Sequence, residues 1–178
     1  INGNTSSGGN GGGVYCIGGS NPTLENMTIT NNVAQTGGGI YCSYSNPTLT
    51  NVTFTENTTS LYGSGMYLSN SNPTLTNVKI ANNTAQQSGG GMYLITSNPT
   101  LTNVTISGNT AESGGGLQIN NSSPTLTNVT IHGNTGGDGA GIKFINSGGN
   151  LSNVFISENV ASTGGGITFF SSNPTLTN

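Results

Sequence analysis

The chain has no Trp and no Arg, and only two Lys, five acidic residues and one His stand among its 178 residues. With a net charge of −3, it lacks the basic patch by which proteins bind nucleic acid or an anionic membrane. It also lacks any apolar run of about 20 residues, the length that a membrane-spanning helix needs. The sequence therefore predicts neither a nucleic-acid partner nor membrane insertion by this segment.

Strong helix formers are scarce as well, whereas the chain has 30 Gly and many Asn, Thr and Ser. Apolar residues alternate with Thr or Tyr in runs of three to five between Gly, Pro and Asn. This period of two is typical of short strands and excludes helical repeats, whose apolar residues recur every 3.6 positions.

One motif recurs along the whole chain. It reads Asn-Pro-Thr-Leu-Thr-Asn-Val-Thr-Ile, followed by a variable stretch and then Gly-Gly-Gly-Ile-Tyr. Its Leu recurs every 25 or 26 residues, at Leu24, Leu49, Leu75, Leu101, Leu126, Leu151 and Leu176. A fixed period of this size indicates a solenoid, in which each repeat buries its apolar face against its neighbours.

The predicted fold is all-β: a right-handed parallel β-helix (β-solenoid) of about seven coils, each of 25 or 26 residues with three strands. The strands are expected around Thr-Leu-Thr, Val-Thr-Ile and Gly-Ile-Tyr, on the sides of a triangular coil. Residues 1–178 form a single β-helix segment, which we expect to be cut from a longer repeat protein.

Four columns of the aligned repeats stay apolar and are expected to point inward. They are Leu24 to Leu176 as above; Ile29, Phe54, Ile80, Ile106, Ile131 and Ile156; Ile40, Met66, Met92, Leu117, Ile142 and Ile167; and Cys42, Leu68, Leu94, Ile119, Phe144 and Phe169.

Corners are predicted at recurring Asn and Gly. An Asn ladder with left-handed backbone is expected at Asn32, Asn57, Asn83, Asn109, Asn134 and Asn159, each amide bonding to the next coil. The Gly runs supply positive φ and close backbone approach. The variable stretch between the Asn and the glycines is expected to be a loop. The Asn-x-Thr triplets at Asn26, Asn51, Asn103 and Asn128 match glycosylation acceptors, but we interpret them as corner geometry.

Two elements of the repeat carry a family resemblance: Gly38-Gly39-Ile40 with its equivalents, and Phe54-Thr55-Glu56-Asn57 with its equivalents. In this pairing the chain resembles the repeats of chlamydial-type polymorphic outer membrane proteins and other right-handed parallel β-helix surface proteins. The resemblance implies a secreted or surface-displayed segment, extracellular or on the cell surface. The same fold carries adhesins, enzymes and passive stalks, so it does not decide the function.

Cys16 and Cys42 occupy one column of adjacent coils. At the spacing of paired strands their Cα atoms would lie about 4.8 Å apart, inside the range of a disulfide. A disulfide would suit an extracellular protein, whereas two free thiols would fill the same column as small apolar groups. Both alternatives stay open at this stage.

Catalytic residues are hard to assemble. The acids are Glu25, Glu56, Glu112, Asp138 and Glu158. Glu56 and Glu158 share a column about 19 Å apart, and only Glu112 and Asp138, one coil apart in the variable stretch, could come close. His132 replaces Thr or Ser in an outward column. The sequence predicts no catalytic residues, no metal, no cofactor and no enzyme.

Two outward ladders are candidate binding surfaces. Thr48, Thr50, Thr74, Thr76, Thr100, Thr102, Thr125 and Thr127 form a flat Thr face, continued by Thr175 and Thr177. This lattice resembles the Thr-x-Thr array of ice-binding β-solenoids, although Glu25, Asn150 and Ser152 interrupt it and Thr also stabilises stacked strands. Tyr15, Tyr41, Tyr67 and Tyr93 form a Tyr ladder, which could stack on sugar rings or a second fibre, or only support its own strands.

The function favoured by the sequence is an extracellular structural or adhesive segment, such as a cell-surface fibre, stalk or filament that associates with itself. Carbohydrate or a host or cell surface is a further candidate partner. The alternatives are an ice-binding β-solenoid and a non-catalytic part of a pectate-lyase-like carbohydrate-active enzyme.

Overall fold

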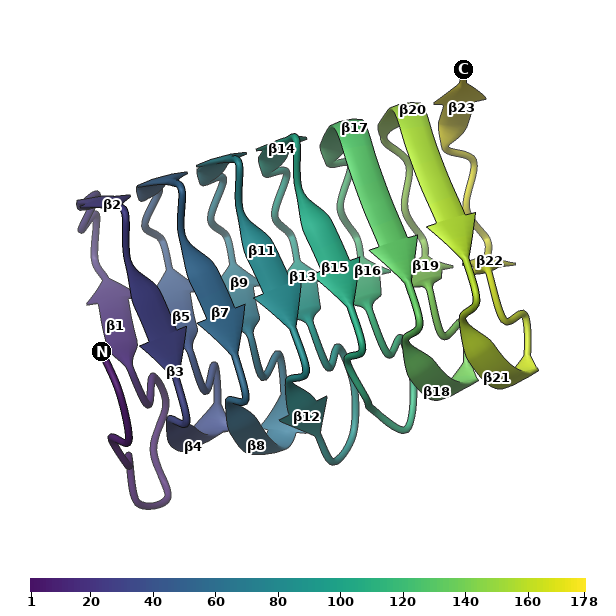
Figure 1. The fold of residues 1–178 in the computed structure, drawn as a ribbon. Helices are drawn as coiled ribbons and strands as arrows, with labels where there is room; N and C mark the ends of the chain where they lie inside the picture. The colour runs from purple at the N-terminus through teal and green to yellow at the C-terminus, as the bar shows by residue number, and fades with distance from the viewer.

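A computed structural model describes residues 1–178 as a solenoid of parallel strands without helices. Successive coils lie side by side along one axis, so that the N-terminus and the C-terminus are at opposite ends (Figure 1). Equivalent strands of neighbouring repeats pair in parallel. The predicted parallel β-solenoid of about seven coils is therefore confirmed.

The first sheet takes one strand from each coil and contains the Gly-Ile-Tyr segments. Its order is β1-β5-β9-β13-β16-β19-β22. The bounds are β1 Val14–Ile17, β5 Ile40–Ser43, β9 Met66–Ser69, β13 Met92–Ile95, β16 Leu117–Asn120, β19 Ile142–Ile145 and β22 Ile167–Phe170.

The second sheet carries the other two predicted strands of each repeat and bends between them. The Thr-Leu-Thr side holds β2 Thr23–Glu25, β6 Thr48–Thr50, β10 Thr74–Thr76, β14 Thr100–Thr102 and β23 Thr175–Thr177. The Val-Thr-Ile side holds β3 Thr28–Thr30, β7 Thr53–Thr55, β11 Lys79–Ala81 and β15 Thr105–Ser107. In two coils a single long strand covers both sides, β17 Thr125–His132 and β20 Asn150–Ser157.

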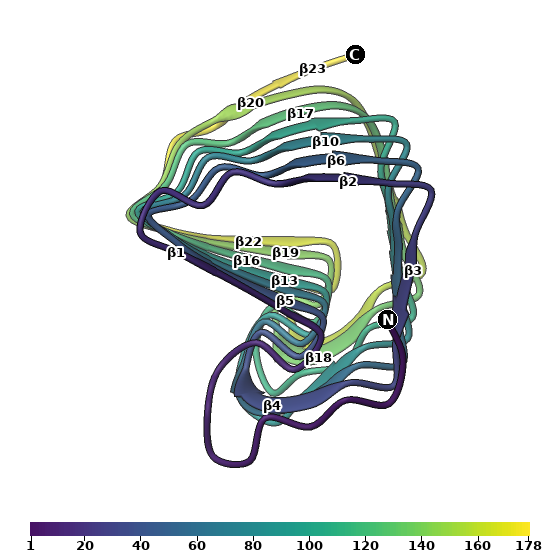
Figure 2. The same cartoon turned by 90° about the vertical axis from the view of Figure 1, so that its left-hand side faces the viewer.

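The variable stretch forms a fourth side of the coil and is not the expected loop. Its strands are β4 Val33–Thr36, β8 Thr58–Tyr62, β12 Thr84–Ala85, β18 Thr135–Asp138 and β21 Val160–Thr163. Viewed along the axis, the coil is not the expected triangle, because this side folds outward and leaves a re-entrant angle beside the first sheet (Figure 2). Parallel neighbours give these backbone amides partners that a free loop would lack.

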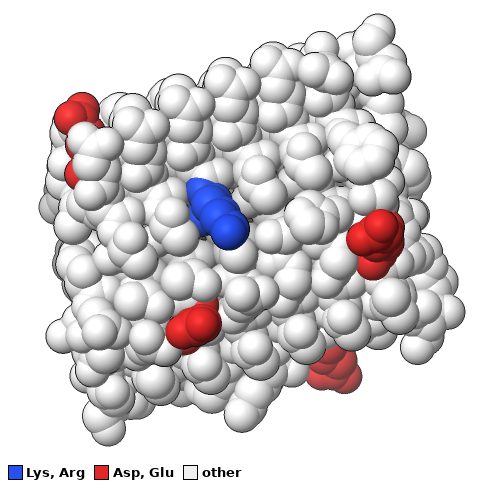
Figure 3. Space-filling view, viewed as in Figure 1, with Lys and Arg blue, Asp and Glu red and all other residues white.

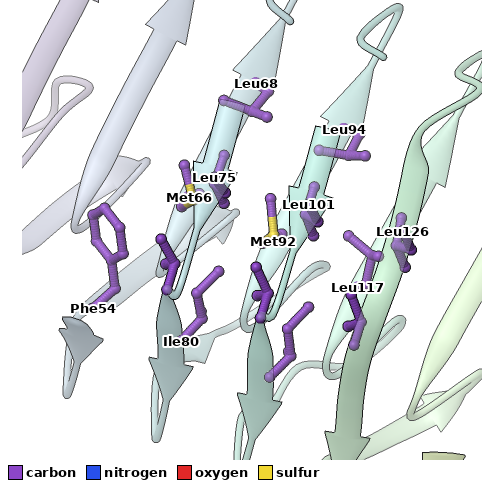
Figure 4. Packing of buried hydrophobic residues seen from close by; sticks show 14 of the residues in the cluster. Phe54, Met66, Leu68, Leu75, Ile80, Met92, Leu94, Leu101, Leu117 and Leu126 are labelled. Atoms are coloured by element: carbon purple, nitrogen blue, oxygen red, sulfur yellow. The ribbon is translucent and has the colours of Figure 1, made fainter. Parts of the chain in front are cut away.

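The four predicted inward columns form the core, except that Phe169 and Leu176 in the last coil are 47% and 51% exposed. Leu49, Leu75 and Leu101 are fully buried and stand in direct register, Leu75 between the other two. Figure 4 shows such columns of Leu, Ile, Met and Phe filling the interior. A fifth inward column was missed: Val52, Val78, Val104 and Val129 are also buried, as the two-residue alternation before each inward Ile or Phe requires.

The Asn ladder is present and fully buried. Asn83 donates both its backbone N–H and its Nδ2 to Oδ1 of Asn109, each at 3.0 Å, and the same pair of bonds recurs between the other coils. One detail of the prediction was wrong, because the left-handed residue is the one before the ladder, such as Asn31 at φ 54° or Glu56 at φ 55°. The corner bends there, which turns the next Asn side chain inward.

A second buried polar ladder was also missed. Ser45, Ser71, Ser97, Ser122 and Ser147 lie in one column. The backbone N–H of each donates to the hydroxyl oxygen of the serine in the next coil, as Ser71 N does to Ser97 Oγ at 3.0 Å. The glycines allow the coils to come close at the corner: a Cβ on Gly39 would lie 2.5 Å from the carbonyl oxygen of Gly65. The hydrogen bonds of the buried Asn and Ser ladders and the close approach of the glycine corners together fix the register of the coils.

Candidate functional site

The flat Thr face is in the place that the sequence predicted. Its outer column is exposed and paired coil to coil, as in Thr74↔Thr100 and Thr100↔Thr125. The second column, which includes Thr76 and Thr102, is half-buried. Within each column, successive threonines lie about 4.8 Å apart along the solenoid axis. The face therefore presents hydroxyl and methyl groups on a regular lattice.

The Tyr ladder is a continuous stack, but it is not an exposed row. Ring centroids lie 5.2 Å apart for Tyr15 and Tyr41, 5.1 Å for Tyr41 and Tyr67, and 5.4 Å for Tyr67 and Tyr93. Exposure falls from 52% at Tyr15 to 9% at Tyr93. At Tyr93 the ladder is covered by Tyr62 from the fourth side, whose ring lies 5.0 Å from that of Tyr93.

Burial and stacking change the acidity of this ladder. Desolvation raises the pKa of Tyr67 to about 12, and the neighbouring Tyr41 and Tyr93 add to the rise. Desolvation also raises the pKa of Tyr41 and of Tyr93. Tyr93 in addition accepts a hydrogen bond from Asn120 Nδ2 at 2.6 Å, which acts in the opposite direction.

We expect an alkaline titration to reveal this ladder. Because the pKa of Tyr67 is raised in the folded state, the folded protein keeps this phenol proton to a higher pH than the unfolded chain does. The contribution of Tyr67 to the free energy of unfolding is therefore fully present below about pH 10 and is lost as the pH rises towards about 12. The absorbance of tyrosinate should therefore show an ionisation step well above pH 10. Tyr67→Phe should reduce the amplitude of that step. A titration in which all six tyrosines ionise together near pH 10 would contradict the stacked ladder.

Cys16 and Cys42 face each other in directly paired strands, and both are buried free thiols. Hydrogen bonding between them lowers the pKa of Cys16 to about 7 and raises the pKa of Cys42, since the Cys42 thiol donates to the Cys16 thiolate. They are neighbours, as predicted, and a disulfide between them stays a prediction.

A polar cleft of about 540 Å³ lies between the first sheet and the fourth side in the middle coils. One wall is a column of the first sheet, Tyr93, Gln118 and Lys143. The other wall is a column of the fourth side, in which Tyr62, Ser88, Ser113 and Asp138 are bridged coil to coil. Gln87 and Glu112 complete the lining.

Two of the three charged residues of the cleft, Lys143 and Asp138, form an ion pair. Lys143 Nζ lies 2.7 Å from Asp138 Oδ2 and donates to Ser113 Oγ at 3.0 Å. The hydrogen bond from Lys143 lowers the pKa of Asp138 below its usual value. Glu112 is exposed at the rim. Gln118 is only 6% exposed, and its Oε1 has no hydrogen-bond partner.

The other polar candidates do not converge. Glu56 and Glu158 are corner residues of distant coils, and His132 is half-buried in the column of Ser107 and Ser157. No three His, Cys, Asp or Glu side chains come close enough together to hold a metal ion. No segment forms a helix of the length and apolar character that crossing a membrane requires.

Comparison with protein families agrees with this geometry. A family model described as the right-handed β-helix region matches residues 1–97 and 52–178, which together span the chain. The chain belongs to the right-handed β-helix family. The search of curated proteins gives no match. Family membership fixes the class of repeat and the hand of the coil, and it is shared by enzymes and non-enzymes alike.

Sequence reasoning found one wall of the cleft in this β-helix and missed the other. The Tyr ladder was predicted as an outward column, and Gln118 and Lys143 hold the same position in the two repeats that follow Tyr93. Tyr62, Ser88 and Ser113 were not, because the variable stretch differs in length between coils. The bridges from Tyr62 to Ser88 and on to Ser113 supply the alignment that the sequence does not.

Proposed function

We propose that this β-helix is a structural or adhesive element outside the cell, a stiff fibre or stalk that associates laterally with copies of itself and is not an enzyme. The observation that carries the proposal is the Thr face, a flat and uncharged lattice kept in register over successive coils. Figure 3 shows how sparse charged side chains are on the side of the solenoid that faces the viewer. Because so few charges lie on this surface, two copies that approach each other meet little like-charge repulsion.

The hydrogen bonding of the backbone supports the role of a stiff structural element. Parallel pairing runs through all four sides of the coil, and the buried Asn and Ser ladders add side-chain bonds along the axis. Two Lys and no Arg leave few positions for proteases that cleave after basic residues. Such a chain resists bending and proteolysis, which suits an extracellular setting and agrees with the resemblance to surface-displayed repeats.

Sedimentation velocity over a range of protein concentrations tests the proposal. We expect the parent to associate and Thr100→Lys to stay monomeric, because a lysine on the Thr face sets like charges against each other between copies. Leu176→Lys, at a residue 51% exposed in the last coil, is the matched control and distinguishes contact through the end of the solenoid from contact along its side. A parent that remains monomeric, or a Thr100→Lys variant that associates like the parent, would refute lateral assembly.

Ice binding is the second candidate, and the same lattice favours it. Paired Thr74, Thr100 and Thr125 at the strand spacing give the regular hydroxyl and methyl array that such a surface needs. Thermal hysteresis is the decisive measurement. We expect it, if present, to disappear in Thr100→Tyr, whose bulky ring breaks the flat face, and its absence from the parent would exclude this candidate.

A further inference from the structure

The polar cleft is a second surface of the β-helix, separate from the Thr face and not needed for a fibre. It opens where the stacked column of rings ends, since Gln118 follows Tyr93 in one wall and Ser88 follows Tyr62 in the other. Replacement of large rings by Gln and Ser leaves a space of about 540 Å³. From Tyr62 to Asp138 the wall crosses three coil steps, about 14 Å along the axis.

Two residues that line the cleft each carry a buried side-chain oxygen without a hydrogen-bond partner, Gln118 through Oε1 and Asp138 through Oδ1. Gln118 is 6% exposed and lines the space, and its Oε1 makes no hydrogen bond. Its Nε2 reaches only Asn120 Oδ1, at 3.5 Å. Buried amide oxygens are almost always satisfied, so a buried acceptor without a partner, on a residue that lines a cleft, indicates a ligand that brings a hydrogen-bond donor.

The remaining groups narrow the chemistry of that ligand. Lys143 is held by Asp138 at 2.7 Å and by Ser113, so its charge is neutralised within the wall. Glu112 at the rim makes the cleft slightly negative, which disfavours anions. A divalent cation is disfavoured as well, because the ammonium group of Lys143 lies against the carboxylate of Asp138.

An extended peptide is disfavoured by the backbone of the walls. Peptides add to a sheet through unpaired amides, whereas here Gly89 N donates to Ser113 O at 3.0 Å and Ser113 N donates to Gln87 O at 2.9 Å. The walls offer side chains only. Tyr62 is half-buried, so part of its ring faces solvent beside hydroxyl groups of Ser88 and Ser113.

We propose that this cleft binds a neutral oligosaccharide lying along the solenoid axis. A sugar ring packs its C–H face on Tyr62, and a hydroxyl group donates to Oε1 of Gln118. Further hydroxyls exchange hydrogen bonds with Ser88 and Ser113, which can both donate and accept. A neutral chain rich in hydroxyl groups offers donors for Gln118 Oε1 and an apolar ring face for Tyr62. It also needs no free cationic charge, which the paired Lys143 could not supply.

Isothermal titration calorimetry of the full chain tests the proposal with four neutral hexasaccharides, namely those of cellulose, starch, laminarin and chitin, and with hexagalacturonate as the anionic probe. We expect at least one neutral probe to bind and the anionic probe not to bind. Tyr62→Ser, which copies the Ser found next in its column, and Gln118→Leu should each weaken binding about tenfold. Tyr44→Ser, at an exposed tyrosine outside the cleft, is the matched control and should bind like the parent.

A second measurement needs no variant and therefore does not depend on variant folding. In the parent, a bound probe should shift the NMR signals of the Gln118 side-chain amide and leave those of the buried Asn83 and Asn109 amides in place. The proposal is overturned if no neutral probe binds, if only hexagalacturonate binds, or if Tyr62→Ser and Gln118→Leu bind like the parent. Sedimentation of the parent is an independent readout, so self-association and sugar binding can fail separately.

Discussion

Leu101→Asp is expected to unfold the middle of the solenoid, with a loss of about 4 kcal/mol or more. Leu101 is fully buried and pairs with Leu75 on one side and Leu126 on the other, so a carboxylate there has no partner and no water. It also removes an apolar contact from two neighbouring coils at once. Thermal denaturation followed by circular dichroism measures the effect.

Thr100→Asp is the control for this change, because Thr100 precedes Leu101 on β14 and points to solvent. The same charge on the outer face should cost about 0.5 kcal/mol or less. If Leu101→Asp melts like the parent, or if the two variants lose equal stability, the inward column has been assigned wrongly.

Asn109→Leu is the second large expected effect, at about 2 to 4 kcal/mol. Leu is close to Asn in size, but it cannot accept the bonds that Asn83 donates through its backbone N–H and its Nδ2. Asn109 is fully buried, so water cannot replace the lost acceptor. Chemical denaturation of the parent and the variant compares their free energies of unfolding.

Asn98→Ser serves as the matched control in that experiment. Asn98 belongs to a different, exposed Asn column in which Ser123 already occupies the next coil. The change should cost about 0.5 kcal/mol or less, because solvent reaches the groups it releases. Equal losses in Asn98→Ser and Asn109→Leu would show that burial of the ladder is not what stabilises the corner.

The fold could be predicted from the sequence because each column of the repeat keeps one chemical character. A fixed period identified the solenoid, and alternation around Leu75 or Ile80 identified the inward face. The Val column follows the same alternation and was overlooked, not hidden. The buried Ser column was harder, since a serine next to a corner gives no sign of whether its hydroxyl group faces water or the backbone of the adjacent coil.

The cleft could be predicted only in part. Glu112 and Asp138 were the one pair of acids that the sequence allowed to come close, and both line it. The contact of Tyr62 with Tyr93 depends on how far the fourth side bends outward, which is set by backbone pairing in a stretch of variable length. Residue identity alone does not determine that angle. The exposed Tyr row was accordingly an expectation that the structure corrects at Tyr93.

The central claim is that each repeat advances the chain by one strand spacing in parallel register. Spin labels at Thr23 and Thr175, exposed ends of one column six coil steps apart, test it by pulsed dipolar spectroscopy. The labels require Cys16 and Cys42 to be replaced by Leu, the residue that follows them in their column at Leu68. A single distance near 29 Å is predicted from the strand spacing of about 4.8 Å. A broad distribution, or a distance far from that value, would contradict the solenoid.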